Sequence, residues 1–337
     1  MQLTHKEITN KPMGAEITLP PLVSIVVVTY NSAQFVLETL ESARNQSYKN
    51  IELIITDDCS TDNTLEICST WLQKNKAEFV HSTIITHDKN TGIAANCNRG
   101  FTAAKGEWIK GIAGDDILFP DCILDSIEFS KIDNAINIFQ SLAKNYLDTF
   151  EECNFQSITA NKNYPYGHLT SKQQYEILQY ASFPIASAVF MKRSFFMDMG
   201  KYDESLPLED WPFWLKITKR NQKIYQLNKV TVGYRIHNKS AFHQKQNKSI
   251  FSKYYLRDRM VYDKYIKGNC SKTTKFFINY KHYIQVYFDK LRLNNKSIYP
   301  IKALFYLLNK PYQYRVKHLL STFEHQINKE DLKNVEV

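Results

Sequence analysis

Two adjacent carboxylates stand directly after an apolar segment near the middle of the chain. Gly114-Asp115-Asp116 follows the strand-like run at residues 108–113, and Pro120 comes where a helix is expected to begin. In an open parallel sheet, ligands collect beyond the carboxyl ends of the strands. Paired Asp side chains there suit a hard divalent cation, which takes oxygen ligands and often bridges to substrate phosphates. Because Gly and Asp are also common turn residues, the three residues taken alone favour an ordinary turn.

Further polar side chains stand at the ends of other apolar segments. Asp57-Asp58 follows the run at residues 51–56, and His237 ends the run at residues 230–237. Glu209-Asp210 comes directly before an aromatic segment that has the composition of a helix. The helix dipole favours negative charge at a helix N-terminus, so this last pair is compatible with capping as well as with chemistry.

Strands alternate with helices in the first third of the chain, and this pattern positions the acids. The continuous β-branched run at 22–30 is typical of a parallel strand buried on both faces. We predict strands at residues 22–30, 51–56, 79–86 and 108–113, with amphipathic helices between them. This alternation favours a parallel sheet with right-handed crossovers, so the acidic clusters are expected on one rim. Beyond it we predict helices at 121–130, 171–180 and 192–199, and strands at 185–191 and 230–237, with one or two irregular strands between residues 131 and 163.

The composition indicates a soluble globular protein. The 337 residues are 43% hydrophobic and 23% charged, and no run approaches the roughly 18 apolar residues of a membrane-spanning helix. The first twenty residues lack the apolar core of a secretory signal. The six cysteines show no ligand spacing, which favours buried free thiols in a reducing compartment. We therefore expect a cytoplasmic protein.

The positive charge gathers in the last quarter of the chain. Residues 246–337 contain 18 Lys and Arg against 7 Asp and Glu, and 11 of the 21 tyrosines, within a net charge of +9. We predict a polar leader at 1–20, a catalytic domain at 21–245 and a basic, aromatic helical region at 246–337. That region could lie on the anionic inner face of a membrane or pack on the catalytic domain. Nucleic-acid binding is not expected, because no recognition motif accompanies the charge.

Seven fragments, in order, resemble the family 2 glycosyltransferases, which are inverting enzymes with a GT-A fold, here of the bacterial surface-polysaccharide type. The matching fragments are VSIVVVTYN at 23–31, DDCSTD at 57–62, Asn90-Thr91-Gly92 with Asn98-Arg99-Gly100, Gly114-Asp115-Asp116 with Pro120, GKYDE at 200–204, LEDW at 208–211 and YRIH at 234–237. The implied fold is α/β, a Rossmann-like, mostly parallel central sheet flanked by helices, with a helical C-terminal extension. Ala113 replaces the first Asp of the motif Asp-x-Asp-Asp, which leaves the metal affinity open.

The resemblance implies a nucleotide-sugar site at the strand ends. Asp58 would accept a hydrogen bond from uracil N3–H, while Asp57 would bond backbone groups. Two residues would contact base and ribose, Thr29 and Asn31. Three would shape the floor of the diphosphate site, Asn90, Gly92 and Arg99, although Arg99 fits a plain surface cation equally well.

The resemblance also implies the catalytic groups. Asp116 would be the direct ligand of Mn2+ or Mg2+, Asp115 would contact the ribose or the metal, and His237 is a further candidate for the metal or the diphosphate. Asp210 would be the base that deprotonates the acceptor hydroxyl. Glu209 would lie beside it, near the acceptor or the donor sugar.

The implied reaction moves a sugar from a nucleotide diphosphate, most simply a UDP-sugar, to a glycan or lipid-linked glycan. The acceptor would belong to surface polysaccharide synthesis, as O-antigen, capsule or lipo-oligosaccharide. Trp211 could stack on this acceptor or lie in the core. The sequence leaves the oligomeric state open.

Two other classes of protein compete with this interpretation. A nucleotidyltransferase would carry a Gly-rich, basic loop after the first strand, where this chain has Tyr30-Asn31-Ser32-Ala33. A non-catalytic scaffold that binds nucleotide sugars would not need Asp115, Asp116 and Asp210, all of which are present.

Overall fold

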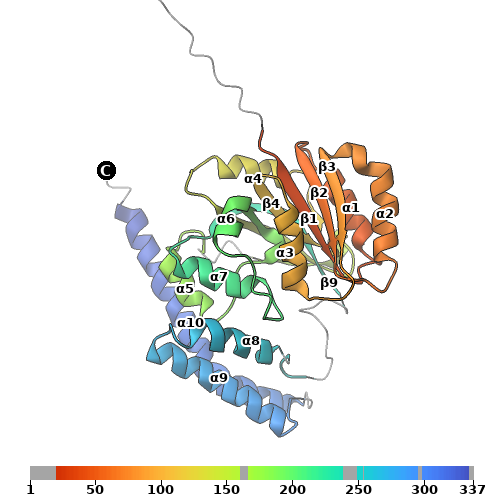
Figure 1. The fold of residues 1–337 in the computed structure, drawn as a ribbon. Helices are drawn as coiled ribbons and strands as arrows, with labels where there is room; N and C mark the ends of the chain where they lie inside the picture. The colour runs from red at the N-terminus through yellow and green to blue at the C-terminus, as the bar shows by residue number, and fades with distance from the viewer. Residues whose placement is uncertain (1–19, 160–165, 238–248, 253, 295–297, 334–337) are drawn as a thin grey trace, which may run out of the picture.

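The β-branched runs form the centre of the sheet in the computed structural model. β1 (Val23–Thr29) is buried along its whole length between β2 (Ile51–Asp57) and β4 (Trp108–Ala113), parallel to both, and β3 (His81–Thr86) adds parallel to β2. A strand buried on both faces needs no polar alternation, which is why β1 is almost entirely apolar, whereas the edge strand β3 is only partly buried. The register pairs Thr29 with Asp57, so the loops that follow these strands leave the sheet at one rim (Figure 1).

The structure describes residues 20–159, 166–237, 249–252, 254–294 and 298–333. The predicted leader falls almost wholly outside these residues, as does the predicted boundary at residue 245. All six cysteines lie inside them and are free thiols, as predicted, although Cys59, Cys153 and Cys270 are not buried.

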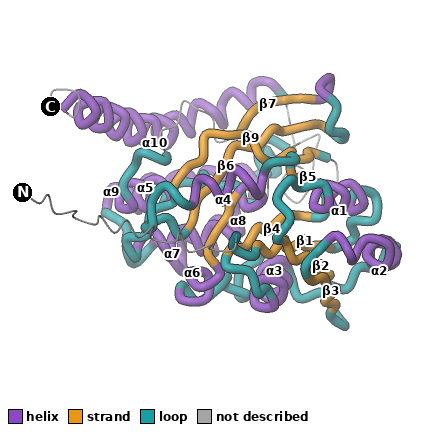
Figure 2. The backbone as a smooth tube through the Cα atoms, turned by 90° about the horizontal axis from the view of Figure 1, so that it is seen from above, coloured by secondary structure: helices purple, strands orange, loops and turns teal. Residues whose placement is uncertain are grey.

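The second half of the sheet is mixed. The strand order is β3-β2-β1-β4-β8-β6-β9-β5, with β7 paired to β6 (Figure 2). The added strands are β5 (Ile117–Leu118), β6 (Ile138–Leu147), β7 (Phe155–Thr159), β8 (Val189–Lys192) and β9 (Tyr225–Ile236). β8 runs antiparallel to β4, so the predicted parallel order holds from β3 to β4 and ends there. The strand predicted at 185–191 is shorter, because η3 (Ala186–Ala188) occupies its first part.

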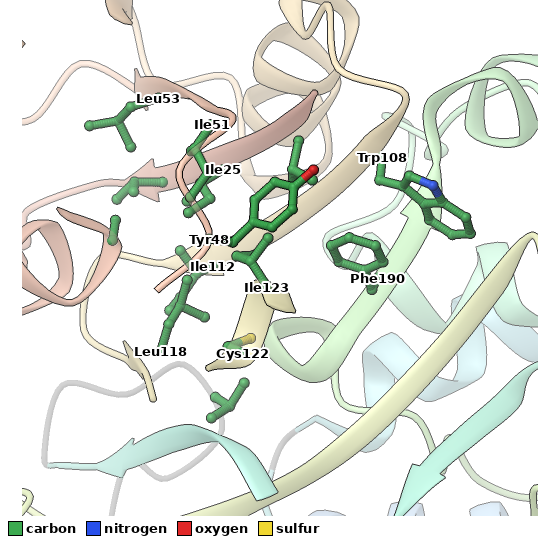
Figure 3. Packing of buried hydrophobic residues seen from close by; sticks show 14 of the residues in the cluster. Ile25, Tyr48, Ile51, Leu53, Trp108, Ile112, Leu118, Cys122, Ile123 and Phe190 are labelled. Atoms are coloured by element: carbon green, nitrogen blue, oxygen red, sulfur yellow. The ribbon is translucent and has the colours of Figure 1, made fainter. Parts of the chain in front are cut away.

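Helices cover both faces of the sheet. One face carries α1 (Val36–Arg44), α2 (Thr64–Asn75) and α4 (Cys122–Ser130), and the other carries α3 (Ile93–Ala103), α6 (Arg193–Asp198) and α7 (Asp210–Lys219). Two short 3-10 turns are η1 (Lys76–Glu78) and η2 (Glu152–Asn154). In the hydrophobic core under α1, α2 and α4, the Trp108 ring stacks on the Phe190 ring with centroids 5.1 Å apart (Figure 3). The predicted α/β fold class is confirmed.

The C-terminal region is helical, as predicted. It consists of α8 (Tyr255–Val261), the π-helix η4 (Tyr262–Ile266), α9 (Lys272–Lys290) and α10 (Tyr299–Lys333). Its inner faces pack on the α/β unit near α5 (Ser171–Leu178), where the Tyr312 hydroxyl donates to the Tyr180 carbonyl at 2.8 Å. Among the described helices, none has the length and apolar character required to cross a bilayer.

Candidate active site

The turn after β4 passes tightly against β1 and turns its two carboxylates in different directions. A Cβ atom at Gly114 would lie 2.9 Å from the Thr29 Cγ2 atom, so only glycine allows this approach. Asp116 is buried: its Oδ2 accepts from the Ser187 hydroxyl at 2.6 Å and its Oδ1 from the Arg235 backbone N–H at 2.9 Å. Burial, and then the charge of Asp115, raises the Asp116 pKa well above its usual value. Asp116 therefore anchors the turn, and its role as direct metal ligand stays a prediction.

Asp115 is the carboxylate that faces outward. Its side chain is 28% exposed, and its Oδ2 lies 3.0 Å from the His237 Nε2 atom at the end of β9. The imidazole packs on the Phe35 ring, with centroids 4.5 Å apart.

The Asp115–His237 pair can be compared with the geometry that a divalent cation requires. Two neighbouring ligands of an octahedral ion, each about 2.1 Å from it, lie about 3.0 Å apart. Among the described residues no cluster of three or more His, Cys, Asp or Glu side chains could hold a metal. Magnesium-type sites commonly use one or two protein ligands together with substrate phosphates, so Asp115 and His237 fit a cation that arrives with a diphosphate.

Arg235 holds this turn in place, a role that sequence reasoning missed. The buried guanidinium donates to three acceptors, the carbonyls of Asp115 and Asp148 and the Glu38 carboxylate. It also lies over two aromatic rings, those of Phe35 and Phe150. The sequence signals were the match of YRIH at 234–237 to the family pattern and a positive charge within a predicted strand, and the partners lie up to 197 positions away.

Replacing Arg235 by Lys is expected to lower the free energy of unfolding by about 2–3 kcal/mol, because a single ammonium cannot reproduce a planar fork that bonds several acceptors. Urea denaturation measures this loss. Arg44→Lys is the matched control, since Arg44 forms a half-exposed pair with Glu41 and should change stability by less than about 1 kcal/mol. Equal stability of the two variants would contradict the positioning role of Arg235.

A second cluster gathers around Asp58 at the end of β2. Its carboxylate accepts four hydrogen bonds, from the Thr91 hydroxyl and backbone N–H, the Gly92 N–H and the Arg99 guanidinium. Burial opposes ionisation, but these hydrogen bonds outweigh it and hold the Asp58 pKa below its usual value. Gly92 has φ +92°, a conformation that favours glycine, and its N–H is also 3.1 Å from the Asn90 side-chain oxygen.

Of the residues predicted to bind the nucleotide sugar, Asn90, Gly92 and Arg99 are therefore brought together around Asp58, whereas the Thr29 and Asn31 side chains bond other residues. Because the protein itself supplies four donors to this carboxylate, the uracil contact of Asp58 stays a prediction. Thr29 is buried and donates to the Asp57 carboxylate at 2.8 Å. Asn31 lies at the exposed rim with φ +52°, where its side-chain oxygen accepts from the Thr61 N–H at 2.8 Å.

Glu209 and Asp210 form the acidic pair at the start of α7. Both side chains are partly buried, and the Asp210 Oδ1 accepts from the Trp211 backbone N–H at 2.6 Å. Burial, and then the charge of Asp210, raises the Glu209 pKa to about 8. Burial raises the Asp210 pKa to about 6, although the Trp211 N–H lowers it. Burial thus outweighs the helix terminus, and near neutral pH the coupled pair is expected to hold one proton.

The partly buried Tyr234 and the buried Cys97 each lie near more than one of the acidic clusters. Burial and then the charges of Asp116, Asp115, Asp210 and Glu209 raise the pKa of the Tyr234 phenol. Burial and the charges of Glu209, Asp210 and Asp58 likewise raise the pKa of the Cys97 thiol, which Arg99 lowers. Tyr234 on β9 is therefore near both the Asp115–Asp116 turn and the α7 acids, and Cys97 on α3 is near both those acids and the Asp58 cluster.

Trp211 is packed rather than presented to a ligand. Only 8% of it is exposed, and its indole N–H donates to the Leu178 carbonyl at 2.7 Å. Core packing explains this residue, and the acceptor contact stays an untested prediction.

Comparison with known proteins defines the class. The family model described as Glycosyl transferase family 2 matches residues 24–200. The Escherichia coli protein WfaP, a UDP-Glc:alpha-D-GlcNAc-diphosphoundecaprenol beta-1,3-glucosyltransferase, is 30% identical over 64% of this chain and 78% of its own. This chain belongs to glycosyltransferase family 2 and is a glycosyltransferase.

Solved structures share the fold. Staphylococcus aureus TarS 1-349 in complex with UDP-GlcNAc superposes with a TM-score of 0.53 at 18% identity, covering 93% of this chain and 89% of that one. The mannosyltransferase PcManGT from Pyrobaculum calidifontis, in complex with GDP-Man and Mn2+, gives 0.51 at 15% identity, covering 90% and 73%. These neighbours confirm a GT-A fold.

Proposed function

We propose that this enzyme transfers a sugar from a UDP-sugar to a glycan or lipid-linked glycan by an inverting single displacement. The observation that carries the proposal is that two acidic pairs, at residues 115–116 and 209–210, both lie close enough to Tyr234 for their charges to raise the pKa of its phenol. A single displacement needs charge stabilisation on the leaving-group side of the sugar and a base on the opposite side. The relationship to WfaP supports a UDP-sugar donor and an acceptor from surface polysaccharide synthesis.

We assign distinct roles to the residues on the donor side. Asp115 and His237 would hold Mn2+ or Mg2+, which when bound stabilises the negative charge of the departing diphosphate. Asp116 and Arg235 keep the Asp115 turn in place, and Asp58 orders the loop of Asn90 and Gly92 together with Arg99. Thr29 and Asn31 complete the rim on which the nucleoside would lie.

We assign the proton transfer to the pair at the start of α7. Asp210, ionised near pH 7, accepts the proton of the acceptor hydroxyl as that oxygen attacks the sugar C1 atom. Glu209, protonated at the same pH, can donate a hydrogen bond to the acceptor or the donor sugar without opposing the charge of Asp210.

A donor panel tests this function. We expect UDP-sugars to raise the melting temperature, by several degrees at saturation, only when Mn2+ or Mg2+ is present, because the donor supplies the remaining metal ligands. GDP- and dTDP-sugars at equal concentration are the matched ligands, and UDP-sugars with EDTA are the metal control. Stabilisation by GDP-sugars alone would overturn the UDP assignment, and stabilisation by a nucleotide sugar without turnover in any transfer assay would favour the non-catalytic scaffold.

A further inference from the structure

An aromatic stripe runs along the outer face of α9. Phe276, Tyr283 and Tyr287 are 62%, 70% and 63% exposed, and Tyr280 lies between them with its ring stacked on Phe276. Their spacing of three and four residues places them on one side of the helix. The buried residues of α9 occupy the opposite side, namely Thr274, Gln285 and Phe288. The stripe is therefore not the face by which α9 packs on the protein.

Exposed lysines bracket this stripe. Lys272 and Lys290 lie on the same side of the helix as Tyr283, one at each end of α9. They are 18 positions apart, so the face is about 27 Å long. In residues 271–325 the sequence has ten Lys and Arg against two acids, Asp289 and Glu324, and the Asp289 carboxylate is occupied by the Tyr255 hydroxyl at 3.1 Å.

Part of α10 borders the same face. The Tyr280 hydroxyl donates to the Leu308 carbonyl at 2.8 Å. This contact brings Leu304 and Leu308, which are one turn apart and both exposed, to the edge of the stripe. In Figure 1, α9 lies at the edge of the molecule, on the far side of α8 from β1–β3.

We propose that this face, the α9 stripe with Lys272 and Lys290, docks on the surface of an anionic lipid bilayer. Tyrosine suits the boundary between headgroups and acyl chains, since its ring is apolar and its hydroxyl is polar. The lysines match the negative potential of the bilayer surface, and leucines at the border add apolar contact. A second copy of the chain would bring the same positive charges to the interface, so charge complementarity favours the membrane over self-association.

Vesicle flotation with the full-length protein tests this docking. We expect binding to vesicles of 30% phosphatidylglycerol in phosphatidylcholine, weakening as salt rises, and little binding to phosphatidylcholine alone. The variant Lys272→Gln/Lys290→Gln should lower the partition coefficient about 25-fold, since each lysine near an anionic surface contributes about fivefold. Tyr283→Ser/Tyr287→Ser should lower it at least tenfold. Matched controls remove exposed groups elsewhere, as Lys74→Gln/Lys131→Gln and Val80→Ser/Ile132→Ser.

The outcomes separate this docking from self-association and from the catalytic proposal. Failure of the wild type to bind anionic vesicles, or equal binding by stripe and control variants, overturns the docking. Light scattering could instead show a dimer that the stripe variants dissociate and the control variants do not. If the stripe variants then bind vesicles as the wild type does, the face belongs to a contact with a second copy, and the membrane docking is overturned as well. Stripe variants should keep wild-type stabilisation by UDP-sugar and metal, so failure of the docking leaves the donor test unaffected.

Discussion

Asp210→Asn is expected to lower kcat for sugar transfer by about 10³-fold, within the range that general-base catalysis contributes. The amide keeps the shape of the side chain and the hydrogen bond from Trp211, but it cannot accept the proton of the acceptor. Stabilisation by UDP-sugar and metal should be unchanged, because we assign the donor contacts to other residues, namely Asp115, His237 and the Asp58 cluster. Asp198→Asn, at an exposed position of α6, is the matched control and should retain full activity.

The pH dependence of the same reaction provides a second test of Asp210 as the catalytic base. Its pKa of about 6 in the folded protein predicts that kcat/KM falls as the pH drops below about 6, where the base becomes protonated. If protonated Glu209 assists, kcat/KM also falls above about pH 8. These values belong to the coupled pair. A profile that stays flat from pH 5 to 9, or an Asp210→Asn variant with normal transfer, would remove the assignment of the base.

Loss of the Asp210 carboxylate should not unfold the protein. A carboxyl whose pKa is raised in the folded state binds its proton more tightly there, so its contribution to stability falls as the pH rises from about 4 through about 6. At pH 8 the neutral Asn therefore avoids this cost, and Asp210→Asn should unfold at the same urea concentration as the wild type or a higher one. This measurement separates lost chemistry from lost folding.

Asp115→Asn is expected to lower kcat/KM by about 10²–10³-fold, since it removes the outward carboxylate that we assign to the cation. The direct measurement is a Mn2+ titration followed by thermal stabilisation with UDP-sugar, in which the midpoint should move to at least about tenfold higher metal concentration. Asp88→Asn, an exposed residue of the loop after β3, is the control and should keep the wild-type midpoint.

The variant Asp116→Asn tests which of the two neighbouring carboxylates binds the metal and which one holds the turn in place. Because both oxygens of Asp116 accept from protein groups, this variant should lose folding stability while keeping a Mn2+ midpoint closer to that of the wild type than Asp115→Asn does. The opposite ranking of the two midpoints would return the direct ligand role to Asp116, as the family resemblance implied.

Much of the fold was predictable because its signals are local. The β-branched run at 22–30 is typical of a strand buried on both faces, and the alternation of strands and helices favoured a parallel sheet with the acids at one rim. The strands after β4 were harder to predict, since β8 and β9 take their places through pairing with β4 and β6. Such pairings depend on the whole sheet rather than on the residues of one strand.

The orientation of individual site residues could not be read from the sequence. Asp115 and Asp116 are identical neighbours, and only the partners Ser187 and Arg235, distant in sequence, turn one inward and leave the other exposed. Likewise, burial and the helix terminus shift the Asp210 pKa in opposite directions, and their balance follows from packing. Trp211 was ambiguous for the same reason, since helical spacing fits both a core residue and a sugar platform.

The central claim is that Asp115, His237 and Asp210 serve one bound donor. A crystal grown with Mn2+ and the UDP-sugar that gives the largest thermal shift tests it, because anomalous scattering locates the metal. The account predicts a manganese peak within coordination distance of Asp115 and His237, with the sugar C1 atom between it and the Asp210 carboxylate. A metal bound elsewhere, or a sugar that turns away from Asp210, would contradict it.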